Sequence, residues 1–451
     1  MKRKAIVLAA GQGKRMKSEH SKVMHTILNE PMLGHVIREL EAVNTDLIEV
    51  IVGHQKEEII NHFKNRIHTA VQEPQLGTGH ALMCSLQLSD EEGLVLITYG
   101  DVPCVSKETF EAVFKQAQAV DALILTTILD NPSSYGRIVR DVNKQITGIV
   151  EAKDASEEEK KIREINTGII CFDQKKLFKH LKELKNQNAQ NEYYLTDMIK
   201  IFHDYGYKIE GMIVEDANEV MGVNDRVQLA QATKVIQRRI NTYWMNEGVT
   251  LVDPENTWID ASSVIGRDCM IEPNSLLIHA TLKGHVHLKG TCAIEHSSIG
   301  EHSIIDHSKI IDSKVGAHTT IGPYAHIRVH CEIGNHCRIG NFVEMKKTVL
   351  GDHSKSAHLT YLGDAIIGKN VNIGCGVVTV NYDGKHKFTT IIKDGAFVGS
   401  NSNLIAPISI GENALVAAGS TLTCDVEDQA MGIARAYQVN KPSKGQTYKH
   451  K

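Results

Sequence analysis

The sequence predicts two fold classes in one chain: an α/β doubly wound domain with a mostly parallel sheet, joined by a long helix to a left-handed parallel β-helix of hexapeptide repeats. Short apolar runs alternate with longer amphipathic stretches over residues 1–226. A helical pattern covers residues 225–247, and from about residue 262 a branched aliphatic residue recurs every six positions. We therefore expect one domain over 1–226, a helical linker over 227–247 and a repeat domain over 248–451.

The size and charge of the chain exclude several classes of protein. With 451 residues, it is long enough for more than one domain. Its 50 Lys and Arg residues nearly balance its 54 Asp and Glu residues, which gives a net charge of −4. A balanced surface provides no electrostatic field for nucleic acid or anionic lipid, so we expect neither nucleic acid nor a membrane as a partner.

The cysteines and the amino terminus indicate a cytoplasmic protein. The nine Cys residues form no CxxC pair, which argues against a disulfide framework or a Cys-rich zinc site. The apolar run Ala5–Ala10 follows three basic residues, as in a signal peptide, but it is too short and no cleavage pattern follows it. No stretch approaches the roughly 18 apolar residues that would span a membrane.

The elements of the first domain follow from its apolar runs. Strands are expected at Ala5–Leu8, Ile48–Val52 and Leu94–Thr98, with helices at Met32–Val43 and Lys56–Phe63 between them. Alternating strands and helices at this spacing indicate a parallel sheet covered on both faces. In such sheets, ligands bind at the carboxyl ends of the strands.

The predicted linker helix has a stop and a start signal. Apolar residues recur at spacings of three and four, at Leu229, Ala232, Ile236, Ile240 and Tyr243. The residue pair 224–225 can cap its start, and the glycine at 248 can close its end. The alternative is that this segment is simply the last helix of the first domain.

The six-residue period predicts a triangular solenoid in which each aliphatic residue points inward. The inward positions are expected at Ile265, Ile271, Ile299, Ile305, Ile311, Ile321, Ile327, Ile333, Ile339, Met345, Val398, Leu404, Ile410 and Val416. Two stretches, Lys346–Ala365 and Val380–Lys393, break the period. We expect them to be loops pushed out from one face, where function tends to lie.

A glycine-rich loop follows the first strand and points to phosphate binding. Gly11 and Gly13 allow the backbone to approach a phosphate closely, and Arg15 and Lys22 add positive charge. The spacing matches neither a Walker A loop nor the dinucleotide pattern. On this stretch alone, a tight strand-to-helix turn without a ligand is an equally good interpretation.

Further motifs follow in an order that resembles a known family. After Leu8-Ala9-Ala10-Gly11-Gln12-Gly13-Lys14-Arg15-Met16 come Gln72, Gln75-Leu76-Gly77-Thr78-Gly79-His80, Tyr99-Gly100-Asp101, Tyr135-Gly136-Arg137, Glu151, Asn166-Thr167-Gly168 and Gly222-Val223-Asn224. This series resembles the signature of sugar nucleotidyltransferases. Joined to a hexapeptide solenoid, the chain resembles the bacterial bifunctional N-acetylglucosamine-1-phosphate uridyltransferases and glucosamine-1-phosphate acetyltransferases over about residues 4–440.

The resemblance implies a uridyltransferase site in the first domain. It implies that Asp101 and Asn224 hold Mg²⁺, and that Arg15 and Lys22 face the phosphates of UTP and act in catalysis. Carboxylate and amide oxygens are ligands that suit Mg²⁺. The remaining residues implied to bind UDP-N-acetylglucosamine are Leu8, Ala9, Gly11, Gln72, Gly77, Thr78, Tyr99, Gly100, Gly136, Glu151 and Asn166.

The resemblance also implies an acetyltransferase site in the solenoid. It makes His358 the general base for the amine of glucosamine 1-phosphate, and imidazole can accept a proton at neutral pH. The residues implied to bind that sugar phosphate are Arg328, Lys346, Tyr361, Asn372, Asn381 and Tyr382. The residues implied to line the acetyl-CoA cleft are Cys375, Ser400, Ala418 and Arg435.

The other histidines have a simpler interpretation. Fourteen of the 23 His residues lie beyond residue 248, mostly at expected turns such as His302, His318, His336 and His353. We expect these to be solvated turn residues, and their scatter argues against a single metal site.

The resemblance implies that the chain makes UDP-N-acetylglucosamine, a precursor of peptidoglycan and lipid A. It first transfers acetyl from acetyl-CoA to glucosamine 1-phosphate. It then transfers uridylyl from UTP to N-acetylglucosamine 1-phosphate and releases pyrophosphate. The resemblance implies a homotrimer. Two alternatives stay open: a solenoid that only trimerises the enzyme, and an enzyme for another sugar 1-phosphate. The basic tail, Lys441–Lys451, is expected to fray.

Overall fold

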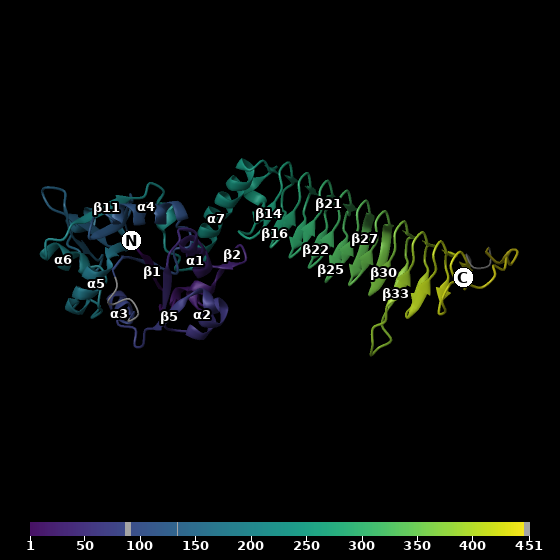
Figure 1. The fold of residues 1–451 in the computed structure, drawn as a ribbon, viewed down its shortest axis with the longest axis horizontal. Helices are drawn as coiled ribbons and strands as arrows, with labels where there is room; N and C mark the ends of the chain where they lie inside the picture. The colour runs from purple at the N-terminus through teal and green to yellow at the C-terminus, as the bar shows by residue number, and fades with distance from the viewer. Residues whose placement is uncertain (86–91, 133, 446–451) are drawn as a thin grey trace. The chain divides into compact units, whose positions relative to one another are not determined.

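The computed structural model describes residues 1–85, 92–132 and 134–445, so the end of the basic tail, residues 446–451, lies outside the described residues. The chain divides into two compact units, Met1–Ile236 and Gln237–Lys451 (Figure 1). In the described part of the chain, no helix is both long and apolar enough to cross a membrane.

The first unit is built on one nine-stranded sheet with the order β11-β7-β10-β6-β1-β4-β5, and β8 and β9 are attached through β10. β10 runs antiparallel to β6, β7 and β8, and β8 and β9 run antiparallel to each other. Its strands are β1 (Arg3–Leu8), β4 (Leu47–Val52), β5 (His68–Val71), β6 (Leu94–Tyr99), β7 (Ala122–Ile128), β8 (Arg137–Arg140), β9 (Ile146–Val150), β10 (Glu164–Asp173) and β11 (Ile209–Ile213), and β2 (Thr26–Ile27) and β3 (Glu30–Pro31) form a separate pair. The three predicted strands are β1, β4 and β6.

Helices cover both faces of this sheet, which confirms the doubly wound α/β class. They are α1 (Met32–Ala42), α2 (Lys56–Phe63), α3 (Thr78–Met83), α4 (Lys107–Ala117), α5 (Gln174–His180) and α6 (Asp197–Asp204). Alternate residues of β1 enter opposite cores: Ala5 and Val7 pack with α1, α2 and α4, whereas Ile6 and Leu8 pack with α3, α5 and α6. The two predicted helices are α1 and α2, and each lies within one residue of its expected bounds.

The predicted long helix is α7 (Arg226–Asn246), and it contributes residues to both units. Of the two candidate caps, Asp225 accepts hydrogen bonds from the backbone amides of Val227 at 3.0 Å and Gln228 at 2.9 Å. The glycine at 248 ends the helix with a φ of +93°. Of the apolar residues that gave the helical spacing, Tyr243 is exposed, and its neighbour Trp244 packs against the core of the second unit.

The second unit is the predicted left-handed parallel β-helix, which runs from β12 (Thr250–Leu251) to β39 (Met431–Gly432). Each short strand pairs in parallel with the equivalent strand of the next coil. One interior column runs through Ile310, Ile327, Met345 and Leu362. All four are fully buried in a single core that extends along the unit.

The structure corrects the expected phase at two places. Ile311 lies outward in β22 (Lys309–Ile311), and Ile310 takes the interior position because the turn before it is one residue shorter. The stretch Lys346–Ala365 is not an extruded loop. It continues the coils through β28 (Val349–Leu350) and β29 (Lys355–Gly363), and the small polar Ser356 fills the interior position between Ile339 and Ile373. Because Ser356 stands where the six-residue pattern requires an aliphatic residue, the sequence pattern missed this coil.

The second predicted interruption, Val380–Lys393, does contain a projecting loop. It leaves the solenoid after β32 (Val378–Val380) and returns at β33 (Thr390–Ile392) (Figure 1). The backbone amides of Lys385 and His386 donate to the Asp383 carboxylate, and a bridge joins Tyr382 to Lys387. The loop therefore has a defined turn of its own.

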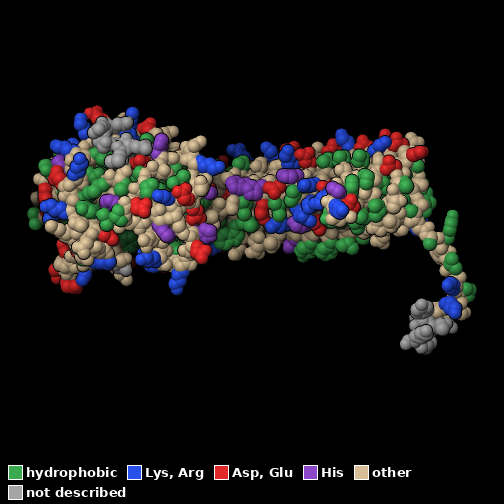
Figure 2. Space-filling model, turned by 90° about the horizontal axis from the view of Figure 1, so that it is seen from below, with side chains coloured by type: hydrophobic (Ala, Val, Ile, Leu, Met, Phe, Trp, Pro, Cys, Tyr) green, Lys and Arg blue, Asp and Glu red, His purple; other side chains and the backbone are tan. Residues whose placement is uncertain are grey.

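The turn histidines of the solenoid are ordered rather than scattered. The rings of His285, His302, His318, His336 and His353 stack in one column, with adjacent centroids 4.5–4.9 Å apart and planes within 6° of parallel. Histidine side chains gather on the solenoid surface in Figure 2. Each of the five has a positive φ, because each occupies the same left-handed corner of successive coils.

Candidate active sites

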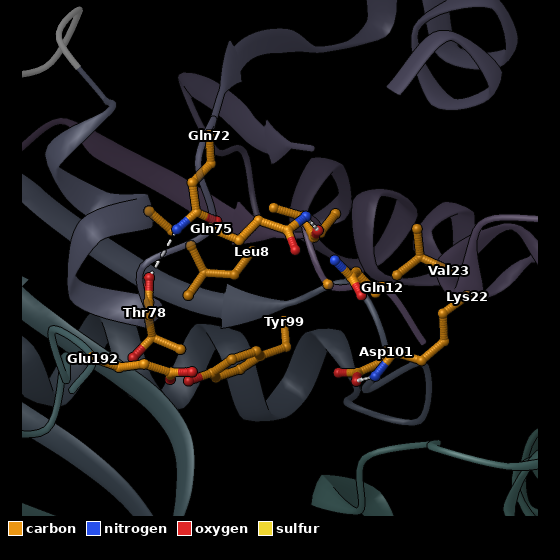
Figure 3. A pocket seen from close by; sticks show the side chains of 15 residues that line it. Leu8, Gln12, Lys22, Val23, Gln72, Gln75, Thr78, Tyr99, Asp101 and Glu192 are labelled. Atoms are coloured by element: carbon orange, nitrogen blue, oxygen red, sulfur yellow. Dashed lines mark hydrogen bonds and ion pairs between the residues drawn. The ribbon is translucent and has the colours of Figure 1, made fainter. Parts of the chain in front are cut away.

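A cavity of about 500 Å³ opens at the carboxyl ends of β1 and β6 in the first unit (Figure 3). This is where ligands bind in open α/β sheets. Nine of the expected residues line it: Leu8, Ala9, Gly11, Lys22, Gln72, Gly77, Thr78, Tyr99 and Asp101. Its remaining walls come from Ala10, Gln12, Val23, Gln75, Ala81 and Glu192.

The glycine-rich loop gives Lys22 its place at this cavity. Gly13 has a φ of +58°, and a Cβ atom there would lie 2.6 Å from the Cβ of Lys22. Any larger residue would therefore push the Lys22 side chain away. Lys22 begins the short 3₁₀ turn Lys22–Met24, and its Nζ contacts the Asp101 carboxylate.

Asp101 and Asn224 converge on that same ammonium group. Lys22 Nζ lies 3.4 Å from Asn224 Oδ1, and the amide of Val223 donates to the backbone carbonyl of Asp101 at 2.8 Å. The two loops are thus tied together by their backbones. Among the described residues, no three His, Cys, Asp or Glu side chains form a metal site. One carboxylate and one amide oxygen fit Mg²⁺, which usually binds few protein ligands together with water and substrate phosphates.

Gly136, Glu151 and Asn166, which the resemblance implies to bind UDP-N-acetylglucosamine, form a second cluster. The backbone amide of Asn166 donates to the Gly136 carbonyl at 2.9 Å, and Thr196 Oγ1 donates to Glu151 Oε1 at 3.1 Å. Burial raises the pKa of the Glu151 carboxyl, although the hydrogen bond from Thr196 opposes that shift. Burial also raises the pKa of the Tyr99 hydroxyl. Gly100 belongs to the cavity side of the site, because its amide donates to the Leu8 carbonyl at 3.0 Å.

Two residues differ from the expectation for this site. Arg15 is exposed on the turn Lys14–Met16 and does not line the cavity. Glu192, which carried no motif signal, does line it. The loop that bears Glu192 is held against α3, where Tyr193 donates to the Leu76 carbonyl at 2.8 Å and Leu195 donates to Thr78 Oγ1 at 3.0 Å. Only the tertiary fold brings this loop to the cavity.

A cationic row crosses the coils of the second unit. Arg328 in β25 (His326–Arg328) pairs with Lys346 in β27 (Arg338–Lys346), which pairs with Gly363 in β29. Arg328 also donates through Nε to Glu344 Oε1 at 2.9 Å. A side-chain contact with Lys387 and the charge of that lysine lower the pKa of the Lys346 ammonium, and desolvation and the charge of Arg328 add to this shift. Lys387 comes from the projecting loop and was not identified from the sequence.

Polar residues surround this row. A Cβ atom at Gly363 would lie 2.5 Å from Tyr361 Oη and 2.9 Å from Asn381 Nδ2. The absence of a side chain at Gly363 therefore leaves room for both polar groups over its backbone. Asn381 is buried and donates through Nδ2 to the Asp364 carboxylate. Tyr382 is exposed, and its hydroxyl donates to the Gly384 carbonyl at 2.6 Å. The structure thus brings most of the expected sugar-phosphate residues to one region.

His358 is exposed in β29, opposite Asn341 of β27 in the parallel ladder. Its backbone carbonyl accepts a hydrogen bond from Thr360 Oγ1 at 2.6 Å, which fixes the strand beside the ring. Asn372 belongs to the next coil, where it pairs with Lys355 of the same strand. The imidazole is therefore open to a ligand from the solvent side.

The expected acetyl-CoA residues occupy equivalent corners of successive coils. Cys375, Ser400 and Ala418 are exposed. The amide of Asn401 donates to the Cys375 carbonyl at 2.7 Å, and that of Gly419 donates to the Ser400 carbonyl at 2.8 Å. Arg435 Nη1 donates to the Ala418 carbonyl at 2.6 Å. These contacts form a continuous ridge at the end of the solenoid.

Family models match both units of the chain. Residues 5–193 match the MobA-like NTP transferase domain. Residues 312–347 match the bacterial transferase hexapeptide (six repeats), and residues 389–424 match the hexapeptide repeat of succinyl-transferase. The nucleotidyltransferase unit and the hexapeptide unit are therefore each recognised independently of their geometry.

Relatives match the chain from end to end. The bifunctional protein GlmU of Listeria monocytogenes serotype 4b (strain CLIP80459) is 48% identical over 444 residues, which is 98% of this chain and 97% of that protein. The GlmU proteins of Shouchella clausii and Halalkalibacterium halodurans are each 46% identical over 441 residues, 97% of both chains. Because relatives of this identity span nearly the whole of both chains, the chain belongs to the family of bifunctional GlmU proteins.

Proposed function

We propose that this transferase makes UDP-N-acetylglucosamine in two steps on two sites. The solenoid transfers acetyl from acetyl-CoA to glucosamine 1-phosphate. The first unit then transfers uridylyl from UTP to N-acetylglucosamine 1-phosphate and releases pyrophosphate. We infer that both steps take place in the cytoplasm, because nucleotide and coenzyme A substrates are used and the nine cysteines form no disulfide.

For uridylyl transfer, the cavity at the ends of β1 and β6 holds the nucleotide. Leu8, Gln72 and Thr78 bind the uridine, and Glu151 and Asn166 orient the acceptor sugar. The acceptor phosphate attacks the α-phosphate of UTP in line, which brings two anions together. Lys22 offsets their repulsion. Mg²⁺ held by Asp101 and Asn224 would supply further charge stabilisation.

For acetyl transfer, the cationic row binds the phosphate of glucosamine 1-phosphate. Arg328, Lys346 and Lys387 provide its positive charge, and Tyr361 and Asn381 contact the sugar. Neutral His358 accepts a proton from the 2-amino group as the nitrogen attacks the thioester carbonyl. The ridge at Cys375 and Ala418 binds acetyl-CoA, and coenzyme A leaves as the thiol.

We also propose that the chain is a homotrimer. Tyr324, Phe342 and Leu359 are exposed apolar residues at one corner of the solenoid, and the first two rings stack 5.8 Å apart. An exposed apolar column supports self-association, and it adjoins His358 in the sequence. Light scattering on the purified chain should give three times the mass of one chain. A mass equal to one chain would contradict the proposal.

The observation that carries the acetyltransferase assignment is the in-register pair of Arg328 and Lys346, beside which the projecting loop places Lys387. Three cationic side chains gathered on one face suit a phosphate ligand, and a scaffold without chemistry has no need for them. The test is to supply acetyl-CoA, glucosamine 1-phosphate, UTP and Mg²⁺ and to follow coenzyme A and pyrophosphate together. Release of pyrophosphate only when N-acetylglucosamine 1-phosphate is added would favour the scaffold alternative.

A further inference from the structure

The Lys22 ammonium occupies the oxygen pair that the proposed function assigns to a metal ion. Its Nζ contacts Asp101 Oδ2 (Figure 3). It also lies 3.4 Å from Asn224 Oδ1. Both side chains of the ion pair are largely buried, with 14% of Lys22 and 16% of Asp101 exposed. This is therefore a sheltered ion pair rather than a surface contact screened by solvent.

The oxygen pair is held in place by groups other than Lys22. The Val223 amide donates to the Asp101 carbonyl at 2.8 Å, and the Asn224 amide donates to Gln228 Oε1 at 2.7 Å. Asn224 Nδ2 faces the Gly222 carbonyl at 3.4 Å, so its Oδ1 is the atom turned toward Lys22. The two loops that carry these oxygens are therefore held together by contacts that do not depend on the ammonium.

We propose that Lys22 is a built-in counter-ion that holds the metal position in the nucleotide-free enzyme and must leave it before a divalent cation can bind. This inference rests on the proposed function, in which Asp101 and Asn224 are the metal ligands. An ammonium group is a compact, strongly hydrated point charge, so it suits the same hard oxygens as Mg²⁺. Two cations cannot share one carboxylate at contact distance without strong repulsion.

The nucleotide gives the displaced ammonium a new partner. Lys22 lines the same cavity as Gly11 and Gln12, so its side chain can turn from Asp101 toward a phosphate bound in that cavity. UTP should therefore promote metal binding, and the metal should promote UTP binding by the same factor. Without nucleotide, the metal must break the Lys22–Asp101 pair and receives no compensating contact.

The test is to titrate the full chain with Mn²⁺ in the absence of nucleotide, with free Mn²⁺ measured by electron paramagnetic resonance. Mn²⁺ takes the same carboxylate, carbonyl and water ligands as Mg²⁺. In Lys22→Gln and in Lys22→Met, we expect Mn²⁺ to bind about tenfold more tightly than in the wild type, within the usual range of coupling between sites. UTP should enhance binding less in these variants than in the wild type.

Lys14→Gln is the matched control, because Lys14 is an exposed lysine of the neighbouring turn and the change removes the same charge. It should bind Mn²⁺ as the wild type does. Asp101→Ala, made alone and with Lys22→Gln, distinguishes the metal role of Asp101 from the counter-ion role of Lys22. If Asp101→Ala abolishes Mn²⁺ binding but both Lys22 variants keep wild-type affinity, the counter-ion is overturned and the metal assignment stands. If Asp101→Ala leaves Mn²⁺ binding unchanged, the metal assignment fails and the counter-ion fails with it.

Discussion

Arg328 and Lys346 are paired, Cα to Cα, in the parallel ladder between β25 and β27. Both side chains therefore leave the same face of the solenoid at adjacent levels. The projecting loop brings Lys387 to them from outside the ladder, where its charge lowers the pKa of Lys346. The ladder alone gives a row of two cationic side chains, and the loop adds a third cation beside it.

Replacing Lys387 with Ala should weaken binding of glucosamine 1-phosphate. Loss of one hydrogen bond to a charged group costs about 1.5–3 kcal/mol, so KM for this substrate should rise about tenfold or more. Steady-state kinetics of acetyl transfer provide the measurement, and kcat should change less than KM. Lys385→Ala, in the same exposed loop, should keep the wild-type KM. A wild-type KM in folded Lys387→Ala protein would mean that the phosphate binds elsewhere.

Replacing His358 with Ala should lower acetyl transfer by about 10²–10⁴-fold, because a general base contributes that much. Substrate binding should change little, since the base acts on the transition state. Uridylyl transfer from supplied N-acetylglucosamine 1-phosphate should be unaffected and serves as the control for folding. An acetyl-transfer rate close to that of the wild type would remove His358 from the mechanism.

Cys375 should react with a maleimide and acetyl-CoA should protect it. Its thiol is exposed beside Ser400, whereas Cys269, Cys292, Cys331 and Cys337 are buried in the solenoid. Exposed thiols react and buried ones are inert. The rate of loss of acetyl transfer under maleimide is the measurement. Cys424 is also exposed, so the decisive control is Cys375→Ala, and equal inactivation of that variant would assign the reactive thiol to another residue.

Much of the fold could be predicted because it follows from local patterns. The continuous apolar runs of β1 and β6 and the six-residue period both record which side chains are buried. The pattern failed where a small polar residue filled the interior, as at Ser356, because serine carries no hydrophobic signal. It also failed at Ile310, because the turn before it is one residue shorter than the six-residue period requires and the period therefore selected Ile311.

The sites were predictable only where a motif marks them. Asp101 and Lys22 lie in recognisable stretches, and the structure brings them into contact. Glu192 and Lys387 carry no motif, and loops placed by tertiary contacts deliver them to their sites. Arg15 shows the reverse case, since a motif residue is exposed away from the cavity lining. Residue type and spacing cannot report the path of a loop.

Stability of the first unit should depend on Glu49, which is fully buried in β4. Ser85 donates to one carboxyl oxygen, and Oε1 accepts no hydrogen bond within the described part of the chain. Burial raises the pKa of Glu49 above its ordinary value of 4.5, against the hydrogen bond from Ser85. The Glu49 carboxyl therefore binds its proton at a higher pH in the folded state than in the unfolded state. As a result, the free energy of unfolding increases as the pH falls from above the raised pKa of folded Glu49 to 4.5.

Glu49→Gln should therefore be more stable than the wild type at pH 7.5 and should lose that advantage near pH 4.5. Thermal unfolding at both pH values is the measurement, and each kcal/mol should shift Tm by about 2–4 °C in a unit of this size. Glu57→Gln, on the exposed side of α2, should leave Tm unchanged at both pH values. A Glu49→Gln protein that is less stable than the wild type at pH 7.5 would show that the ionised carboxylate is stabilised in the fold.

We propose that this chain carries two active sites that work independently. The most direct test is a fragment of residues 1–236, which ends at the boundary between the two compact units. Supplied with UTP, Mg²⁺ and N-acetylglucosamine 1-phosphate, it should release pyrophosphate at a rate close to that of the full chain. Supplied with acetyl-CoA and glucosamine 1-phosphate, it should release no coenzyme A. A folded fragment that cannot transfer uridylyl, or one that does transfer acetyl, would contradict the account.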